Sequence, residues 1–341
     1  MKENSHNNHI NENVIKNNNN FNQATLIDLS VPQKIFNDLN EKFESNSTIV
    51  NALKKWLTIN EVSAKYLFDS TREAKNYLFL SFLYLNGIGC ILDKQKAFNY
   101  TKYSADNGDV VAQTRLSVYY FNGIGVESDF KVSFRWALKA SEKNFPPAQH
   151  LLASIYKSGV GCDEVNFPKA IELLKRSADA GYSSAQFDLA ECYKRGSGIV
   201  ADSKVAYSWY AKAAENGHAK AAFCCGICCK RSFGTERDLD KAIYWFMIAS
   251  KLGDVRSMNC LAKLIFLHTS NKRLAIHWFR KSAELGSLNS QWQLSKCYQY
   301  GIGIQQDIHQ SLFWSRVAEK NHGALALVRL HKTFSHTHLI I

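Results

Sequence analysis

Apolar and small residues recur at helical spacing in seven consecutive units between residues 74 and 331. Each unit predicts a first helix that carries a large residue at its fifth position and a small residue directly after it, both on the packed side. The large residues are Leu80, Leu116, Leu152, Leu189, Cys225, Leu261 and Leu294. The units open at Ala112, Ala148, Ala185, Ala221, Ser257 and Ser290, in steps of 36, 37, 36, 36 and 33 residues. Such a period is typical of a solenoid of stacked helix pairs.

Glycine pairs follow the first helix in five of these units. They are Gly87/Gly89, Gly123/Gly125, Gly159/Gly161, Gly196/Gly198 and Gly301/Gly303. Glycine accepts the left-handed conformation that ends a helix, so each pair predicts a reversal of the chain. An aspartate or asparagine then precedes the second helix and is predicted to cap it: Asp93, Asp129, Asn166, Asp202, Asp238, Asn271 and Asp307. The sixth unit lacks the glycine pair between Leu267 and Asn271, which accounts for its short step.

The second helix of each unit carries a wide side chain at a fixed position. These residues are Tyr100, Trp136, Leu173, Trp209, Trp245, Trp278 and Trp314. We expect the aromatic rings to be buried and to stack into a ladder between units. Truncating one of the tryptophans is expected to cost about 3–5 kcal/mol.

The chain is predicted to have four segments. Residues 1–25 form an Asn-rich leader with little to bury, which predicts disorder. Residues 26–73 contain helical spacing after Pro32, again around Trp56, and more weakly over 61–68, and predict a helical N-terminal cap. This cap either shields the apolar end of the first repeat or docks a partner. Residues 74–331 are the repeats, with an eighth first helix begun at 324–331, and residues 332–341 are a frayed tail.

Composition narrows the function only a little. Of 341 residues, 46% are apolar, and the net charge is +12, which permits nucleic acid, an acidic membrane surface or an acidic peptide as partner. The longest apolar stretch, residues 77–85, is about half the length needed to span a bilayer. Nine cysteines without a repeated pairing pattern, and no signal peptide at the start, predict reduced thiols and a cytoplasmic location, with the nucleus not excluded.

The unit at residues 185–217 carries a family resemblance. It reads Ala-Gln-Phe-x-Leu-Ala-x-x-Tyr, then Gly-x-Gly, then Asp-x-x-x-Ala, then Trp-Tyr-x-Lys-Ala-Ala-Glu-x-Gly. This order resembles the Sel-one-like repeat family, over about three quarters of the chain, and is similar to fungal members. The resemblance implies an all-α, right-handed α/α superhelical solenoid similar to tetratricopeptide repeats. It also implies a non-enzymatic adaptor or scaffold in signalling or complex assembly, without a cofactor.

The binding surface is predicted by analogy with tetratricopeptide packing, in which positions three, seven, ten and eleven of the first helices line a concave groove. These positions give His150, Lys157, Phe187, Glu191, Lys194, Arg195, Lys230, Arg231, Lys263, Trp292, Lys296 and Tyr300. A basic row with aromatic anchors at Phe187 and Trp292 suits an acidic or carboxylate-ending peptide. The alternative is that lysine and arginine near helix C-termini reflect the helix dipole alone. The second helices carry a further basic row: Lys102, Lys139, Lys175, Lys212, Lys281 and Arg316.

Two local motifs have competing explanations. Cys224, Cys225, Cys228 and Cys229 have a spacing that suits zinc or redox chemistry, but the repeat register places all except Cys224 in the packed core. Ser154 and Lys157 match the Ser-x-x-Lys pair of penicillin-binding enzymes, without the accompanying motifs. We therefore predict no catalytic, metal or cofactor site. The alternatives are a nucleic-acid-binding helical repeat protein and a regulatory partner of a separate kinase or cell-wall synthase; the oligomeric state stays open.

Overall fold

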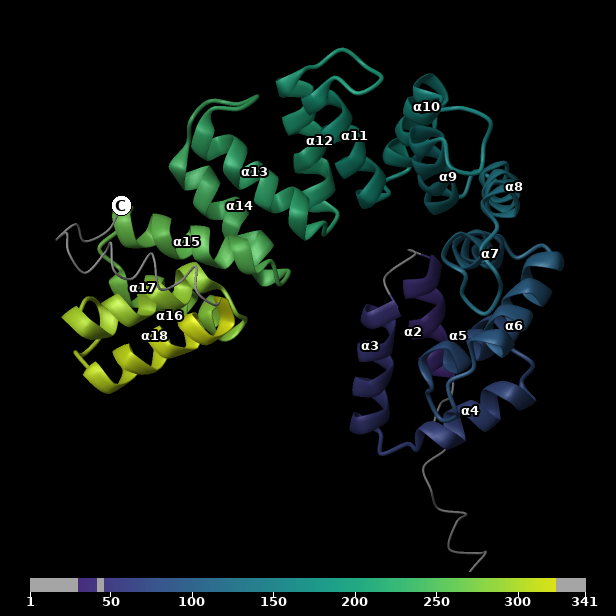
Figure 1. Ribbon diagram of the computed structural model, residues 1–341, viewed down its shortest axis with the longest axis horizontal. Coiled ribbons are helices and arrows are strands. Elements are labelled where there is room, and N and C mark those ends of the chain that lie inside the picture. Colours follow the sequence, from purple (N-terminus) through teal and green to yellow (C-terminus); the bar gives the residue numbers. More distant parts are fainter. Residues whose placement is uncertain (1–29, 42–45, 323–341) are drawn as a thin grey trace, which may run out of the picture. The chain divides into compact units, whose positions relative to one another are not determined.

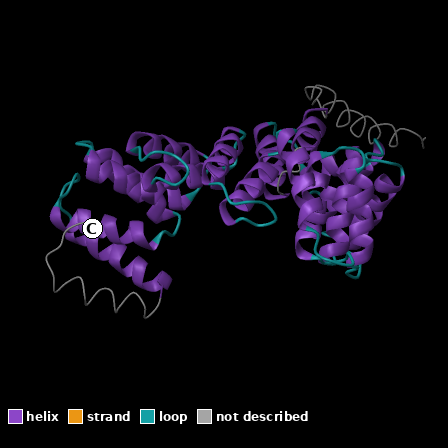
Figure 2. Ribbon diagram, turned by 90° about the horizontal axis from the view of Figure 1, so that it is seen from above, coloured by secondary structure: helices purple, strands orange, loops and turns teal. Residues whose placement is uncertain are grey.

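The computed structural model describes residues 30–41 and 46–322, which contain seventeen α-helices and no strand (Figures 1 and 2). The chain divides into two compact units, Met1–Ala140 and Ser141–Ile341, and each is described by itself. The predicted leader, the C-terminal tail and the eighth first helix at 324–331 lie outside the described residues. The predicted all-helical fold is confirmed.

The N-terminal unit contains three helices before the first repeat and then two helix pairs. They are α2 (Ser30–Glu41), α3 (Asn46–Ile59), α4 (Ala64–Glu73), α5 (Tyr77–Asn86), α6 (Lys94–Asp106), α7 (Val110–Asn122) and α8 (Phe130–Ser141). The helix α4 packs on α5, where the ring of Phe68 meets the ring of Tyr84 edge-on at 5.1 Å. Helical spacing therefore predicted all three helices ahead of the repeats.

The C-terminal unit contains five helix pairs, each with a first and a second helix (Figure 1). They are α9 (Pro146–Ser158) with α10 (Phe167–Asp179), α11 (Ser183–Arg195) with α12 (Ser203–Glu215), α13 (Ala219–Arg231) with α14 (Leu239–Lys251), α15 (Val255–His268) with α16 (Lys272–Glu284), and α17 (Leu288–Tyr300) with α18 (Ile308–His322). Each helix from α9 to α18 packs against the next along the chain. The core is therefore a continuous layer between helix pairs.

Turn and cap residues have the predicted conformations. The first glycine of each predicted pair ends its helix with φ between 63° and 72°. In the fifth repeat Ser232 takes this place at φ 58°, although serine lacks the freedom of glycine. All seven predicted aspartate and asparagine caps accept a backbone N–H from the second helix, as Asp93 does from Lys96 at 2.9 Å. In the sixth repeat α15 ends instead at Thr269 in extended conformation.

The predicted core positions of the first helices are buried. The seven large residues are at most 2% exposed, and the small residues beside them are also buried. Where the small residue is serine, its hydroxyl bonds across the pair, as Ser117 does to the carbonyl of Ser133 at 2.8 Å. In the fifth repeat the small residue is Gly226, and an added Cβ there would lie 2.6 Å from the ring of Phe246. The size of this residue is therefore matched to its partner on the second helix.

The predicted tryptophan ladder is wrong. Among the ring contacts of the described residues, none joins two of the wide residues of neighbouring repeats, and Trp136 and Trp209 are only half-buried. In the second helices of the fourth, fifth and sixth repeats, the more deeply buried ring stands one residue later, at Tyr210, Phe246 and Phe279. Trp245, Trp278 and Trp314 are buried as expected, whereas Trp136 and Trp209 lie nearer the surface under a lysine, as Lys212 covers Trp209 at 4.1 Å from the ring centre. The helical turn of 100° per residue separates these two roles.

Candidate functional site

The face formed by the first helices, here called the first-helix face, is occupied in the N-terminal unit by α2. Phe36 of α2 stacks on Phe79 at a centroid distance of 4.6 Å and meets Phe82 at 5.3 Å. In the repeat numbering that makes Leu80 the fifth position of its first helix, Phe79 is the fourth position and Phe82 is the seventh. Asn40 of α2 accepts a hydrogen bond from Nε of Arg115, at the fourth position of α7. Since Phe36 is 1% exposed, this face buries an amphipathic helix of the chain itself.

In the C-terminal unit, His150 pairs with a residue that the sequence did not single out. Its Nε2 lies 2.9 Å from Oδ2 of Asp188, so that the pair joins α9 to α11. Burial alone would raise the pKa of Asp188. The hydrogen bond and charge of His150, with the charges of Lys157 and His218, outweigh burial and hold that pKa below its ordinary value.

Phe187 is buried rather than available as a surface anchor, which corrects its predicted role. It is 6% exposed and stacks on the ring of His218 at 4.7 Å, while Lys220 covers it at 4.8 Å from the ring centre. His218 also caps α13 through Nδ1, which accepts the N–H of Ala221. Phe187 therefore joins α11 to the start of α13, because the next repeat supplies the side chains that cover it.

Glu191 forms ion pairs with two members of the predicted basic row and offsets one of their two positive charges. Its carboxylate lies 3.4 Å from Nζ of Lys194 and 2.9 Å from Arg195, and it accepts a hydrogen bond from the hydroxyl of Tyr210. Burial pushes the pKa of Glu191 upward, but these partners together lower it. Lys194 and Arg195 are therefore not free to meet an acidic partner with their full charge.

The remaining basic residues are less constrained. Lys230 and Arg231 are exposed at the C-terminal end of α13 and form no ion pair within the described part of the chain. Lys263 and Lys296 are half-buried on α15 and α17. The strongest uncompensated charge on the predicted row thus lies on α13.

Three predicted residues meet at one cavity. Trp292, Lys296 and Tyr300 of α17 line a space of about 150 Å³ together with Ile308 and Leu312 of α18. Tyr300 is 55% exposed, so the cavity opens toward solvent at its edge. Here an aromatic pair and a lysine are positioned to hold an apolar side chain beside an acidic one.

The comparisons with known proteins agree with this geometry. The family model of the Sel1 repeat matches residues 73–109, 110–145, 146–182, 183–218, 219–254, 266–287 and 288–320. The chain belongs to the Sel1 repeat family. Sel1 repeat proteins are generally protein-interaction scaffolds without catalytic activity. The sixth match is the shortest, because it begins at residue 266 and leaves most of α15 outside.

Solved structures share the Sel1 fold. A Sel1 repeat protein from Oxalobacter formigenes is 24% identical, with a TM-score of 0.62, over 92% of this chain and 89% of that one. A protective antigen present in uropathogenic Escherichia coli strains, displaying an SLR fold, is 25% identical, with a TM-score of 0.61. The alignment covers 80% of this chain, which spans only 60% of the antigen. No curated protein sequence matches this chain significantly.

Sequence reasoning missed the fourth position of the first helices in this Sel1 repeat chain. That position holds Phe79, Arg115 and Asp188, all of which make the contacts described above, and the half-buried Cys224 and Cys260. It lies one residue from the predicted third position and on the flank of the same face. The sequence signal for this position was that three chemically different side chains, an aromatic ring, a guanidinium group and a carboxylate, occupy it in different repeats.

The two local motifs of the sequence are explained by packing. Cys225, Cys228 and Cys229 are at most 4% exposed, as the register predicted, and Cys224 is half-buried. Burial raises the pKa of Cys228 to about 12, with neighbouring thiols adding to the effect. Ser154 donates its hydroxyl to the carbonyl of His150.

Within residues 30–41 and 46–322, no three metal-ligating side chains gather at one place. No helix in the described ranges has the length and apolarity of a membrane span.

Proposed function

We propose that this Sel1 repeat chain is a non-enzymatic scaffold that binds a protein or peptide on its first-helix face. The observation that carries the proposal is α2, which buries Phe36 against Phe79 and Phe82 on that face. Because α2 already fills this surface in the N-terminal unit, the part of the first-helix face that we assign to a partner is that of the C-terminal unit. The proposal includes a role in signalling or complex assembly and a cytoplasmic location, both of which rest on the sequence alone.

The charge of this face in the C-terminal unit favours an acidic partner. Lys230 and Arg231 are exposed, and they stand at a helix C-terminus, where the negative end of the helix dipole stabilises positive charge. The cavity beside Trp292, Lys296 and Tyr300 offers an apolar contact on the same row. An acidic segment with one large apolar side chain would use both.

The test is affinity capture by the full chain with quantitative mass spectrometry. We expect the variant Lys230→Glu/Arg231→Glu to lose captured proteins by about tenfold or more, because four units of charge change on the binding face. The matched control is Lys54→Glu/Lys55→Glu, an adjacent exposed basic pair on α3 that also forms no ion pair within the described part of the chain. Equal capture by both variants and the unaltered chain would reject the face as the binding surface.

The affinity-capture samples also test the alternative partners, which are nucleic acid, a separate kinase and a cell-wall synthase. If random RNA is retained at physiological salt and only the Lys230/Arg231 variant loses it, the nucleic-acid alternative replaces the protein scaffold. A kinase or a cell-wall synthase among the lost proteins would support the predicted regulatory role. The similarity to fungal members stays a prediction.

A further inference from the structure

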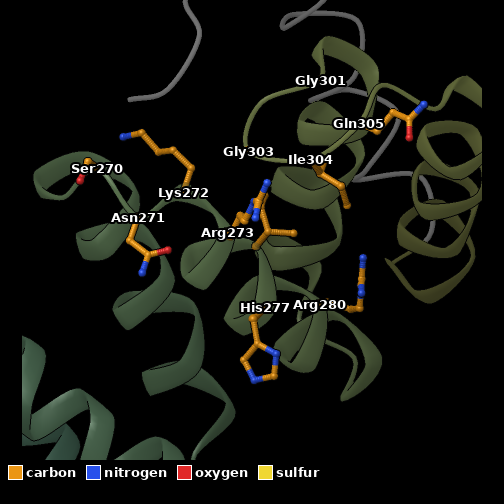
Figure 3. Close-up of a pocket in the computed structure, with 11 residues that line it drawn as sticks. Ser270, Asn271, Lys272, Arg273, His277, Arg280, Gly301, Gly303, Ile304 and Gln305 are labelled. Atoms are coloured by element: carbon orange, nitrogen blue, oxygen red, sulfur yellow. The ribbon is translucent and has the colours of Figure 1, made fainter.

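We propose that a second site, away from the first-helix face, binds a phosphate group. It is a cavity of about 770 Å³ between the start of α16 and the glycine turn that follows α17 (Figure 3). Every ionisable residue that lines it is basic: Lys272, Arg273, His277 and Arg280. Arg273 and Arg280 point toward the segment Gly303–Gln305, whereas His277 points away from it.

The positive charge results from a departure of the sixth repeat from the pattern. Three residues, 269–271, connect α15 to α16, whereas seven, 232–238, connect α13 to α14. Each of the other six connections within helix pairs supplies at least one carboxylate near the start of its second helix, but Thr269, Ser270 and Asn271 supply none. On the opposite wall, Gln305 stands where the second and fifth repeats have glutamate. None of the residues that line the cavity is acidic, although Asp307 caps α18 two residues after Gln305.

The basic side chains are ordered without being neutralised. Arg280 donates a hydrogen bond from Nη2 to the hydroxyl of Tyr298 at 2.8 Å, and Lys272 donates to the carbonyl of Phe266. Neither acceptor carries a charge. Among the ion pairs of the described residues, none involves Lys272, Arg273 or Arg280. Two of the three permanent charges are thus held in place by neutral groups.

The N-terminal unit has a cavity at the same place in its repeat, but that cavity contains a carboxylate. The corresponding cavity of the N-terminal unit, about 740 Å³, is lined by α4 and by the turn after α5. It contains Lys65 and Lys96, but also Asp93, which lies 3.3 Å from Nζ of Lys96. Asp307 stands at the equivalent position of the seventh repeat but does not line the cavity at α16, and among the described residues no ion pair offsets the charge of that cavity.

Charge and geometry favour phosphate over a single carboxylate. Two guanidinium groups present planar pairs of donors, and the positive end of the α16 dipole adds to their charge, whereas the amine of Lys272 points away toward the carbonyl of Phe266. A phosphate monoester with a charge near −2 matches this set better than one carboxylate does. Inorganic phosphate and a phosphorylated side chain share this chemistry.

The experiment is isothermal titration calorimetry of the full chain with inorganic phosphate and with a phosphoserine tetrapeptide. The serine and glutamate versions of the tetrapeptide complete the set. We expect both phosphate probes to bind, and Arg273→Gln/Arg280→Gln to weaken them at least tenfold. Tighter binding of the phosphopeptide than of inorganic phosphate would assign a phosphorylated partner, and the reverse a free anion.

Two controls keep the site falsifiable. Tyr298→Phe removes the partner of Arg280 but no charge, so it should weaken binding less than the double variant. Arg273→Gln alone changes an exposed side chain and should still weaken binding about threefold or more. The site is rejected if the double variant binds inorganic phosphate like the unaltered chain, and the assignment to phosphate is rejected if the glutamate peptide binds equally well. Because the residues differ from Lys230 and Arg231, this outcome is independent of the proposed function.

Discussion

At the scale of single residues, the second glycine of the turn is fixed by a contact rather than by the turn alone. A Cβ on Gly125 would lie 2.0 Å from the carbonyl oxygen of Lys94, and one on Gly234 would lie 1.9 Å from that of Ser203. Lys94 and Ser203 are the first residues of the second helices one repeat earlier. The glycine thus lets each turn touch the helix start of the repeat before it, which explains its recurrence.

Replacing Gly234 by alanine should therefore cost more than its positive φ alone. We expect the loss to exceed that of Gly217→Ala by about 2–3 kcal/mol, since Gly217 has φ 83° but nothing within 4 Å of its Cβ direction. Urea unfolding of the two variants measures the difference. Equal losses would show that the turn conformation, and not the contact, selects glycine.

The pair of His150 and Asp188 predicts a pH dependence. The pKa of Asp188 is lower in the folded chain than the unfolded value of about 3.9, so its stabilisation is present above that value. It is lost as the pH falls through the folded pKa. At pH 7, Asp188→Asn should lower the free energy of unfolding by about 1–2 kcal/mol. The exposed Asp179→Asn serves as the control.

Denaturant unfolding at pH 7 and at pH 3 tests this prediction. The difference between the two chains should narrow at pH 3, because Asp188 is then largely protonated in the unfolded chain and its lowered folded pKa contributes less to stability. A difference that persists unchanged at pH 3 would mean that the amide disturbs packing, and that the charge of Asp188 is not the cause.

At the scale of helices, α2 shows what the first-helix face can hold. Its main apolar contact is the ring of Phe36 on Phe79, and its polar contact is the hydrogen bond that Asn40 accepts from Arg115. Phe36→Ala should weaken the docking of α2 by about 3–5 kcal/mol, because a fully buried aromatic side chain is lost. Amide hydrogen exchange should then become faster in α2 while α6 keeps its protection.

The matched control is Val31→Ala, since Val31 lies on the same helix but is 37% exposed. It should leave exchange in α2 nearly unchanged. If Phe36→Ala also leaves α2 protected, other contacts hold the helix on this face, and the observation behind the proposed function loses its energetic support.

Much of the fold could be predicted from the sequence because each repeat carries cap, turn and core residues at the same positions. The caps of the second helices and the fifth-position core residues recur at a fixed register, which identified them, whereas the turn of the fifth repeat at Ser232 and Gly234 was missed. The site was harder, because burial of Phe187 and the pairing of Asp188 depend on residues 31 and 38 positions away. Spacing shows which side of a helix a residue faces, but not what the next repeat places against it.

At the largest scale that the packing defines, the C-terminal unit is a series of neighbouring helices rather than one central core. Within the C-terminal unit each helix packs on the next, so the stability of a repeat depends on its own contacts and on two interfaces. A local defect should therefore have effects that decline with distance along the unit. This behaviour separates a solenoid from a globular domain, in which one defect lowers protection throughout.

Gly234→Ala tests this prediction, because its side chain would collide at the interface between α12 and the turn after α13. Amide hydrogen exchange should rise most in α12, α13 and α14, by about tenfold or more, and least in α17 and α18. Gly217→Ala in the same unit controls for the general cost of alanine at positive φ. A uniform rise from α9 to α18 would instead mean that the five helix pairs unfold as one cooperative body. The contact of each turn with the preceding helix would then be a link in a global transition, rather than a local term between neighbours.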